Sequence, residues 1–537
     1  MSKTLPVHAT PLNELGLENV SVDGFFSKSD ENRRFDFLKP EPVSFKNGYF
    51  LEDYFPDRDA PAAQWARNGK SYLSSELFFI RLKNVFVFPN RSAIMLAPGV
   101  FLKESLNSVC YGDQDKNFDY LARFLPNITK TDEGLVFDPE ICDRAEVIED
   151  TVMLVNTVQD NYGHWHLDSL LSAYGIRDWI LEKDVKFLMP TTKNEPRRYR
   201  NRGWIHDSLA VLGMGGRLRG TLEPIVFCRD LIYSSRMFTL GTNQPPPLFN
   251  TMTSEIAQRV ARDNSVQIRQ PEYIFLMRKG GGAGRYMLNE EALAAGLQSY
   301  GFECLVPDNF GFADEVKFFG QAKILICQTG AAILNAAYAP EGCIICEIGT
   351  GNVLFSAFVH VAGVTGKRYV MHHVPELIRK DPTREVEAAN RDQCSFEVPL
   401  ESFLPFVARL MELTGVTVNP ETALIRAVAE TRPEIEQGVC YQVLDAPFSP
   451  DQVETLAYAC YIPELARYAD GIGTGPRSPL RLLENGRPIG QPHSSHHDIR
   501  TIGGGRYSHW NNHLLFSASD NSDPNINGRT YSIYFER

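Results

Sequence analysis

The fold class is decided by residues 323–349, which read KILICQTGAAILNAAYAPEGCIICEIG. The apolar segments 323–328 and 343–349 have the length of buried strands and are rich in isoleucine. Residues 331–339 between them are small and apolar, which favours a helix packed closely on a sheet. Strand, helix and strand in this order form the repeating unit of a parallel sheet that is covered on both faces. We therefore predict an α/β fold.

The same alternation of strand and helix patterns continues upstream. It is interrupted at 242–249, TNQPPPLF, because three consecutive prolines fit neither a helix nor a central strand. We therefore predict a doubly wound fold with two facing Rossmann-like halves joined by this linker, and ligands outside the carboxyl ends of the strands. The expected strands are 151–158, 185–190, 222–228, 230–236 and 272–278, and the expected helices are 164–181, 204–214, 252–266 and 289–301.

The two ends of the chain have sequence patterns that differ from the alternating strands and helices of the middle. Residues 76–102 predict two or three strands of a meander, broken by Pro-Asn and Pro-Gly pairs. Residues 471–537 predict a small β module, because turn pairs such as Asn485-Gly486 separate short strand-like runs. Helical patterns occupy 400–415 and 451–469. The predicted domains are a β-rich N-terminal region (1–130), two Rossmann-like domains (131–245 and 250–390), a helical connector (391–470) and the β module (471–537).

Composition excludes several classes of protein. The 537 residues carry 54 basic and 66 acidic side chains, a net charge of −12, so no nucleic-acid partner is expected. Ten cysteines are too few for a disulfide scaffold, and Cys343 and Cys346 would lie on opposite faces of a strand, so no metal site is predicted there. No run approaches the ~20 apolar residues of a membrane span, and the first residues lack a signal-peptide pattern, so we expect a cytoplasmic protein.

The first candidate site is NYGHWHLDS, residues 161–169, where a strand passes into a helix. His164 and Asp168 are four residues apart and therefore share one face of that helix. A carboxylate beside an imidazole is suited to removing a proton from a hydroxyl nucleophile, with either group as the base. The alternative is structural: His164 and Trp165 pack at a domain interface, and Asp168 hydrogen-bonds them.

The second candidate site follows the strand at 272–278 and contains the glycine-rich loop RKGGGAGR. Arg278 and Arg285 flank the glycines, and the arginine side chain is suited to bidentate contacts with phosphate. Strand, flexible loop and helix is a phosphate-site layout, although the sequence fits neither GxGxxG nor the P-loop pattern. An exposed loop with two ordinary arginines is the alternative.

The third candidate site lies at the turn in 328–330, Gln-Thr-Gly, which leads into a helix of small residues. The first backbone N–H groups of such a helix are placed to bind a diphosphate. Glu347 ends the next strand, where a carboxylate would hold a ribose or sugar hydroxyl. The alternatives are close packing of the helix on the sheet and a structural ion pair of Glu347.

A fourth candidate is the basic run RRYRNRGW, residues 197–204. Its arginines, including Arg200 and Arg202, would attract a phosphorylated or acidic glycan acceptor, or they belong to a solvated loop.

The fifth candidate is the histidine-rich β module. Its HSSHHD run, 493–498, is one candidate for a metal site. Its aromatic side chains and one amide suit either a sugar-binding surface or a plain structural role; they are Tyr507, Trp510, Asn527 and Tyr531.

Five sequence blocks, taken in order, resemble glycosyltransferase family 61. They cover about residues 80–375 and read LKNVFVFPNRSAIMLAPGVFLKES, NYGHWHLDSL, RKGGGAGRYMLNEEAL, GFECLVPDNFGFADEVKFFGQAKILI and GAAILNAAYAPEGCIICEIG. The resemblance implies a GT-B-like fold, a nucleotide-sugar donor, inversion at the anomeric carbon and no required metal. It also implies an enzyme of class EC 2.4.

The resemblance also implies roles for single residues. His164 and Asp168 match the catalytic block, and Trp165 of the same block is expected to contact the acceptor. Thr329 stands where the family usually has histidine, so one donor to the diphosphate is missing. The donor-binding residues implied are Arg278, Arg285, Asn289, Thr329, Gly330, Ala331, Asn335 and Glu347.

We therefore expect an inverting glycosyltransferase that moves a sugar from a nucleotide-sugar donor, linked to UDP, to a hydroxyl of a glycan or glycolipid acceptor. The expected setting is synthesis of bacterial surface polysaccharide such as capsule, in the cytoplasm or at the inner face of the membrane, without a cofactor. Two alternatives stay open. One is a catalytically inactive glycan-binding or scaffold protein, which the missing histidine favours. The other is a GT-B-shaped epimerase or phosphorylase, which would turn over without a glycan acceptor.

Overall fold

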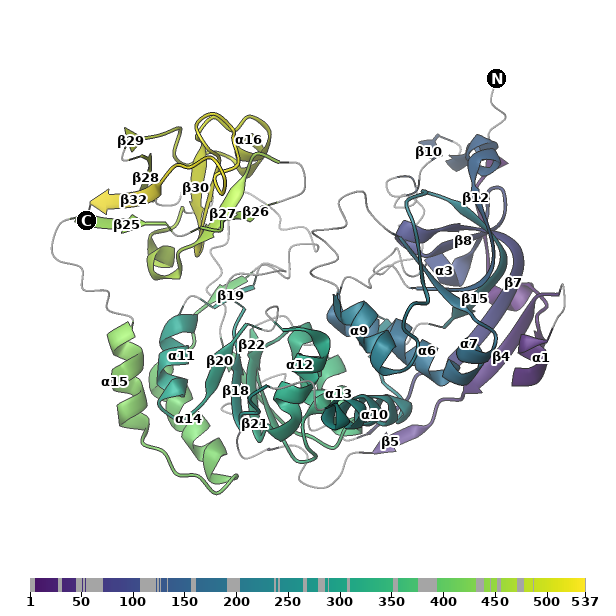
Figure 1. Cartoon of the computed structure of the whole chain (residues 1–537), viewed down its shortest axis with the longest axis horizontal. Helices are drawn as coiled ribbons and strands as arrows, with labels where there is room; N and C mark the ends of the chain where they lie inside the picture. Colours follow the sequence, from purple (N-terminus) through teal and green to yellow (C-terminus); the bar gives the residue numbers. More distant parts are fainter. Residues whose placement is uncertain are drawn as a thin grey trace.

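The structure is a computed structural model in which three parts follow one another along an arc (Figure 1). The N-terminal part is built on a ten-stranded sheet, the central part on a five-stranded sheet, and the C-terminal part on two four-stranded sheets. The residues described are 5–27, 31–44, 51, 54, 71–106, 122, 125, 127–132, 134–155, 161–190, 203–235, 238–239, 242–263, 268–278, 285–287, 289–306, 310–350, 356–374, 394–430, 439–444, 446–451, 455–470, 478–485 and 487–536.

The first sheet contains four parallel strands in the order β14-β13-β12-β15. Numbered along the chain, this order is 3-2-1-4, which is that of half a Rossmann fold. On its other edge β15 pairs antiparallel with β7, which leads into β8 and β9 and confirms the meander predicted at 76–102. The bounds are β7 (Leu77–Phe88), β8 (Ala93–Ala97), β9 (Val100–Leu102), β12 (Glu146–Leu154), β13 (Lys186–Pro190), β14 (Leu218–Thr221) and β15 (Val226–Ser234).

The prediction of separate strands at 222–228 and 230–236 is wrong, because β15 runs through both. Asp230 interrupts the apolar pattern, but its carboxylate lies 2.5 Å from Arg81 Nη2 and 3.0 Å from Lys83 Nζ, both on β7. The strand continues through the charge because the neighbouring strand neutralises it.

The helical segment that follows β12 is irregular. It begins as α5 (Tyr162–His164), widens into the π-helical turn η5 (Trp165–Leu170), and continues as α6 (Leu171–Gly175) and α7 (Arg177–Glu182). The predicted helix at 164–181 is therefore confirmed, but with an inserted wide turn. Such π turns occur frequently at functional sites.

The second sheet consists of five parallel strands in the order β20-β18-β21-β22-β23. In chain order this is 2-1-3-4-5, and its topological switch point lies between β18 and β21. The strand–helix–strand reading of 323–349 is confirmed, with the connecting segment in the tighter 3₁₀ form as η9 (Ala331–Tyr338). The strands are β18 (Tyr273–Leu276), β20 (Glu303–Leu305), β21 (Ile324–Gln328), β22 (Ile344–Thr350) and β23 (Arg368–Val374).

The α/β half built on β12–β15, called the first half below, packs against the second half, built on β18–β23. One hydrophobic core contains Met153 and Phe187 of the first sheet together with Ile274 and Ile326 of the second. The proline-rich segment 242–249 connects the halves and ends inside the first turn of α10. The helices around the second sheet include α10 (Leu248–Arg262), α11 (Glu290–Gln298), α12 (Phe312–Phe318), α14 (Leu400–Glu412) and α15 (Pro420–Glu430), while α9 (Gly203–Val211) belongs to the first half.

The C-terminal part is a β structure with its own core, as predicted for this end of the chain. Its strands begin at Val439, upstream of the expected boundary at 471, and the prediction of helix over 451–469 is wrong. Tyr458 and Cys460 alternate into the module core from β27, and a 3₁₀ helix, η11 (Pro463–Tyr468), follows. The two sheets are β25-β32-β28-β29 and β26-β27-β31-β30, where β25 is Val439–Val443, β26 Ser449–Pro450, β27 Tyr458–Tyr461, β28 Arg481–Glu484, β29 Arg487–Pro488, β30 Tyr507–Trp510, β31 His513–Phe516 and β32 Tyr531–Glu536.

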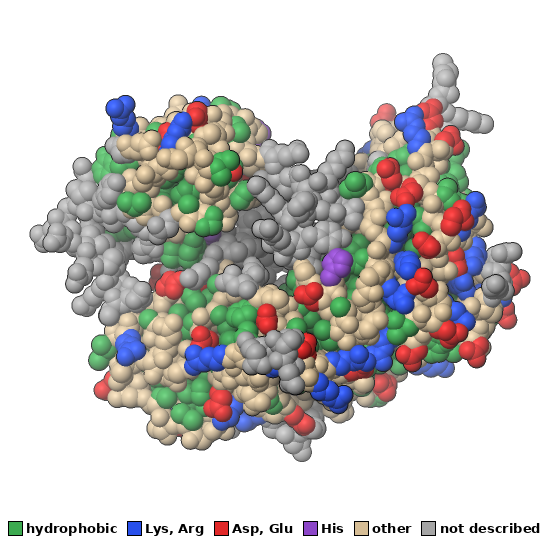
Figure 2. All heavy atoms as spheres, viewed as in Figure 1, with side chains coloured by type: hydrophobic (Ala, Val, Ile, Leu, Met, Phe, Trp, Pro, Cys, Tyr) green, Lys and Arg blue, Asp and Glu red, His purple; other side chains and the backbone are tan. Residues whose placement is uncertain are grey.

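The surface shows how the acidic net charge is distributed. Figure 2 shows Lys and Arg side chains interspersed with Asp and Glu over the face of the N-terminal part. Within the described residues, no helix is both long enough and apolar enough to cross a bilayer.

Candidate functional site

Glu347 lies on β22 near the carboxyl edge of the second sheet and is fully buried. One carboxylate oxygen accepts a hydrogen bond from Thr329 Oγ1 at 2.5 Å, and the other accepts one from the Tyr369 hydroxyl at 2.6 Å. Thr329 also donates its backbone N–H to the Ile348 carbonyl. The carboxylate predicted to hold a sugar hydroxyl therefore anchors the Thr329 turn through the Thr329 hydroxyl.

Arg278 follows β18 and lies over the same turn. Its Nη1 donates to the Thr329 carbonyl oxygen at 3.3 Å, and its backbone N–H donates to Glu290 Oε1 at 2.9 Å. A Cβ atom on Gly330 would lie 3.4 Å from Arg278 Nη1, so the guanidinium lies directly against this glycine. Three predicted donor-binding residues, Arg278, Thr329 and Gly330, are thus together beside the switch point, where ligands of such sheets bind.

Ala331 begins η9 directly after Gly330 and meets the first half of the molecule. A Cβ atom on Gly163 would lie 3.5 Å from Ala331 Cβ and 3.1 Å from Leu334 Cδ1. A side chain at this position would have to displace one of these neighbours, so the glycine favours the close approach of α5 to η9. The first and third candidate sites, which are far apart in the sequence, therefore touch each other.

Asn335 joins the two halves with its side-chain amide. Its Oδ1 accepts a hydrogen bond from the Tyr162 hydroxyl at 2.6 Å, and its Nδ2 donates to Glu315 Oε1 on α12 at 2.5 Å. The residue is buried, and both ends of its amide are engaged. Asn335 was predicted to bind the donor, whereas in the structure it holds α5 against the second half.

His164 and Asp168 lie side by side, as their spacing predicted. His164 Nδ1 is 3.6 Å from Asp168 Oδ2, which is an electrostatic contact longer than a good hydrogen bond. The Asn161 side chain fixes the start of the segment by accepting from the backbone N–H groups of Gly163 and His164. Asp168 is 0% exposed while the His164 side chain keeps 12% exposure, so the histidine is the member of the pair that faces outward.

Trp165 and His166 are both buried. Trp165 lies in the shared core and donates from Nε1 to Ser208 Oγ, which fits the structural alternative of packing between the halves rather than an acceptor contact. His166, to which the sequence assigned no role, is also buried and contacts the Tyr162 carbonyl oxygen through Nδ1 at 2.8 Å. Burial lowers the pKa of His166 to about 4, so the ring is neutral at pH 7. Nothing in the sequence pattern distinguishes this buried histidine from His164.

The remaining predicted site residues are not brought into this cluster. The Asn289 amide makes two hydrogen bonds with the backbone of Val398, at 2.8 Å and 3.0 Å. Arg285 begins β19 (Arg285–Met287), which pairs with β24 (Cys394–Phe396), and only its backbone is described. The glycines at 279–284 and the arginines Arg200 and Arg202 lie outside the described residues.

Cys343 and Cys346 are buried thiols. Burial raises the pKa of Cys343 to about 12 and the pKa of Cys346 further, so both are protonated at neutral pH. Across the described ranges, no group of three or more His, Cys, Asp or Glu side chains is placed to hold a metal ion.

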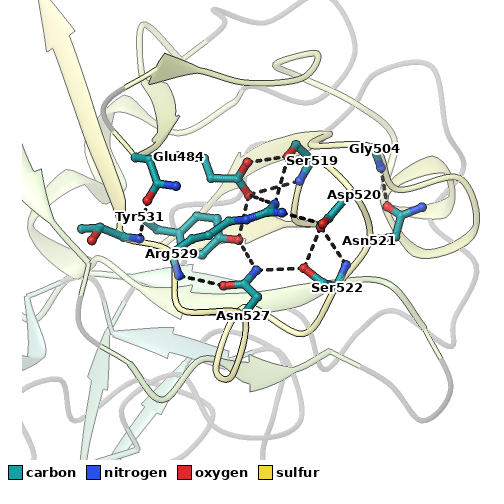
Figure 3. Close-up of polar contacts among 11 residues, drawn as sticks. Glu484, Gly504, Ser519, Asp520, Asn521, Ser522, Asn527, Arg529 and Tyr531 are labelled. Atoms are coloured by element: carbon teal, nitrogen blue, oxygen red, sulfur yellow. Dashed lines mark hydrogen bonds and ion pairs between the residues drawn. The ribbon is translucent and has the colours of Figure 1, made fainter.

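The C-terminal module contains a dense polar network around Glu484 (Figure 3). Glu484 Oε1 accepts from Arg529 Nη1 at 3.1 Å and from the Tyr531 hydroxyl at 2.9 Å, and Arg529 Nη2 lies 2.5 Å from Asp520 Oδ2. Asn527 donates to the Tyr531 hydroxyl. These groups satisfy one another and fix the loop that leads into β32.

Of the alternatives for this module, the plain structural role fits two of its aromatic residues better than a sugar-binding surface. Tyr507 and Tyr531 are buried in the module core, and only Trp510 is half-exposed. Two of the module's histidines are held by polar side chains: His509 Nδ1 lies 2.7 Å from Ser478 Oγ, and His493 Nδ1 lies 2.5 Å from Asp470 Oδ1.

Comparison with known proteins gives one family match. Residues 162–346, about a third of the chain, match the model of the family Glycosyltransferase 61. No curated protein matches the chain significantly. The matched segment starts at Tyr162, includes the His164–Asp168 pair, and continues through Arg278 and the Thr329 turn. The part of this chain that brings the candidate site together is thus similar to glycosyltransferase 61, and the match supports a glycosyltransferase.

Proposed function

We propose that the protein is an inverting glycosyltransferase whose two α/β halves act as the domains of a GT-B fold. The observation that carries this proposal is the contact between Gly163 and the start of η9. This contact brings the His164–Asp168 pair of the first half to the turn of the second half where Arg278 lies. An acid–base pair beside a cationic turn is the combination that glycosyl transfer from a nucleotide sugar requires.

In this proposal the second half binds the donor diphosphate. Arg278 supplies a permanent positive charge, and the first backbone N–H groups of η9 supply hydrogen-bond donors. Charge accumulates on the diphosphate as the bond to the sugar breaks, so these groups stabilise the transition state more than the bound donor. Glu347 is a positioning residue, because it holds the Thr329 turn in place by accepting the hydrogen bond from the Thr329 hydroxyl.

The first half activates the acceptor. The acceptor hydroxyl oxygen attacks the anomeric carbon, its proton passes to His164, and the bond from that carbon to the diphosphate oxygen breaks on the opposite face. The nucleotide diphosphate leaves with the bonding electrons. We assign the base to His164 because its side chain is partly exposed, whereas Asp168 is fully buried and stabilises the imidazolium that forms.

The biological setting rests on the family resemblance alone. We propose a UDP-linked donor, a glycan or glycolipid acceptor, and a role in bacterial surface polysaccharide synthesis on the cytoplasmic side of the membrane. Arg285 is kept as a second contact to the donor for the same reason.

The test is sugar transfer from a panel of nucleotide sugars by the wild type and by His164→Ala, Asp168→Asn and Arg278→Ala. We expect Arg278→Ala to lower kcat/KM roughly 100-fold or more, as when one stabilising donor is removed from an active site. Arg269→Ala is a matched control, because Arg269 is exposed and pairs only with Glu303 among the contacts shown. Unchanged transfer in all three site variants would disprove the assignment.

A second candidate function is a glycan-binding protein without catalysis. The observation that favours it is Thr329, whose hydroxyl is bonded to Glu347 where the family usually has a histidine. Calorimetry separates the two functions: a transferase binds nucleotide diphosphates, whereas a protein that binds only glycans releases no heat with them.

A further inference from the structure

Gln328, the last residue of β21, is in register with residues inside the two neighbouring strands of the second sheet, near its carboxyl edge. Gln328 on β21 is opposite Ile348 on β22, and Ile348 is opposite His372 on β23. Residues in register on parallel strands project to the same face, so Gln328 and His372 share a face. Thr329 and Glu347 alternate with them and lie on the other face.

Gln328 carries a buried amide with unused hydrogen-bonding capacity. The residue is 4% exposed, and neither Oε1 nor Nε2 has a hydrogen-bond partner in the described part of the chain. A buried amide without partners is costly, and buried polar groups in proteins are nearly always hydrogen-bonded. An apolar residue would complete β21 more favourably if packing were the only requirement.

His372 repeats this feature on the same face of the sheet. It is also buried, and its Nδ1 has no hydrogen-bond partner among the residues described. Its ring packs on Phe403 and Phe406 of α14, at centroid distances of 4.7 Å and 5.2 Å. Burial lowers the pKa of His372 to about 4, so the group is a neutral imidazole at pH 7. Two neutral polar groups against an aromatic wall suit a planar polar ligand better than a phosphate.

This pair of residues adjoins the proposed donor site. Leu276 on β18 is opposite Cys327, so Arg278 leaves the sheet beside Gln328 and Thr329, at the switch point. We propose that the Gln328 amide binds the base of the donor nucleotide, through a base edge that presents one hydrogen-bond donor beside one acceptor. A glutamine amide pairs with such an edge through two hydrogen bonds. This inference rests on the proposed function, and it makes Gln328 a determinant of which nucleotide is accepted, because the four bases place their donor and acceptor atoms at different positions along the edge.

The experiment is calorimetric titration of the full chain with UDP, CDP, GDP and ADP, comparing the wild type with Gln328→Leu. We expect the wild type to prefer one base, and Gln328→Leu to bind that nucleotide roughly 10-fold to 100-fold more weakly, with the difference between bases reduced. The melting temperature of the unliganded variant should be equal or higher, because an unpaired buried amide is removed. Thr253→Val is the control, since this buried hydroxyl on α10 bonds only to its own helix among the contacts shown, and nucleotide affinity should not change.

Gln328→Glu is the second variant, and it keeps one acceptor while losing the N–H donor. We expect this variant to change which base is preferred. If it instead weakens the binding of all four nucleotides equally, the added charge repels the diphosphate, and the assignment of Gln328 to the base is overturned. Wild-type affinities in Gln328→Leu would overturn the inference and leave the proposed function intact. Failure of the wild type to bind any of the nucleotides would overturn both.

Discussion

The Tyr369 hydroxyl donates to Glu347, a carboxylate that lies wholly inside the second half. Hydrogen bonds to charged groups contribute more to stability than bonds between neutral groups. We therefore expect Tyr369→Phe to lower the free energy of unfolding by about 1.5–3 kcal/mol. Tyr300→Phe is a matched control, because this buried hydroxyl donates to the neutral Leu404 carbonyl, and its loss should cost about 1 kcal/mol. Urea denaturation measures both; equal losses would contradict the expectation that an unpaired buried carboxyl group costs more than an unpaired backbone carbonyl.

The sequence identifies residues of the site better than it identifies their partners. Arg278 and Thr329 were found because each follows an apolar strand, and such ends meet at one edge of a parallel sheet. Glu347 was expected to end its strand, but β22 continues to Thr350. The bonds of Asn335 to Tyr162 and Glu315 depend on how the two halves pack, and no local pattern encodes that. Gln328 was quoted as part of a turn, but only the three-dimensional structure shows that its amide has no hydrogen-bond partner among the described residues.

The pairing of β7 with β15 depends on a buried charge cluster. Burial alone acts to raise the pKa of Asp230, but hydrogen bonds from Arg81 and Lys83 outweigh it and hold the pKa below its ordinary value. The folded pKa is thus below the unfolded one, about 3.9, so the stabilisation is complete above about pH 4 and is lost as the pH falls further. We expect Asp230→Asn to cost roughly 3–5 kcal/mol at pH 7, and the difference from wild type to shrink below pH 4. Urea denaturation between pH 3 and 7 measures this; a difference independent of pH would contradict it.

The contact between α5 and η9 depends on Gly163. A Cβ atom there would lie 3.1 Å from both Asn161 Oδ1 and Leu334 Cδ1, closer than ordinary contacts. Gly163→Ala should therefore push the two segments apart, lowering stability by about 1–2 kcal/mol and transfer about tenfold, because it displaces the proposed base from the donor. Gly203→Ala is the control, since the nearest atom to its Cβ would be Asp207 Oδ2 at 3.9 Å. Steady-state kinetics of both variants test this, and equal activities would show that the spacing does not matter.

Element types were predicted where one pattern dominates and missed where two compete. The isoleucine-rich strands of 323–349 have no alternative reading, and they are strands. The segment 451–469 offers apolar residues at both helical and alternating spacing, and the module core selects the strand β27. The 3₁₀ form of η9 and the π turn η5 differ from an α-helix only in hydrogen-bond spacing, which packing determines.

At the scale of the whole molecule, the two α/β halves share one hydrophobic core, whereas the C-terminal module has a separate core of residues such as Leu482 and Phe516. The halves should therefore unfold together and the module by itself, which predicts two transitions in calorimetry of the full chain. A chain ended after Glu430 should lack one transition and still bind nucleotide diphosphate, because Arg278 and the Thr329 turn are retained. Leu482→Ala in the full chain should lower only the transition of the module, by about 2–5 kcal/mol. A single transition that moves as a whole in Leu482→Ala would show instead that the module and the halves are one cooperative unit.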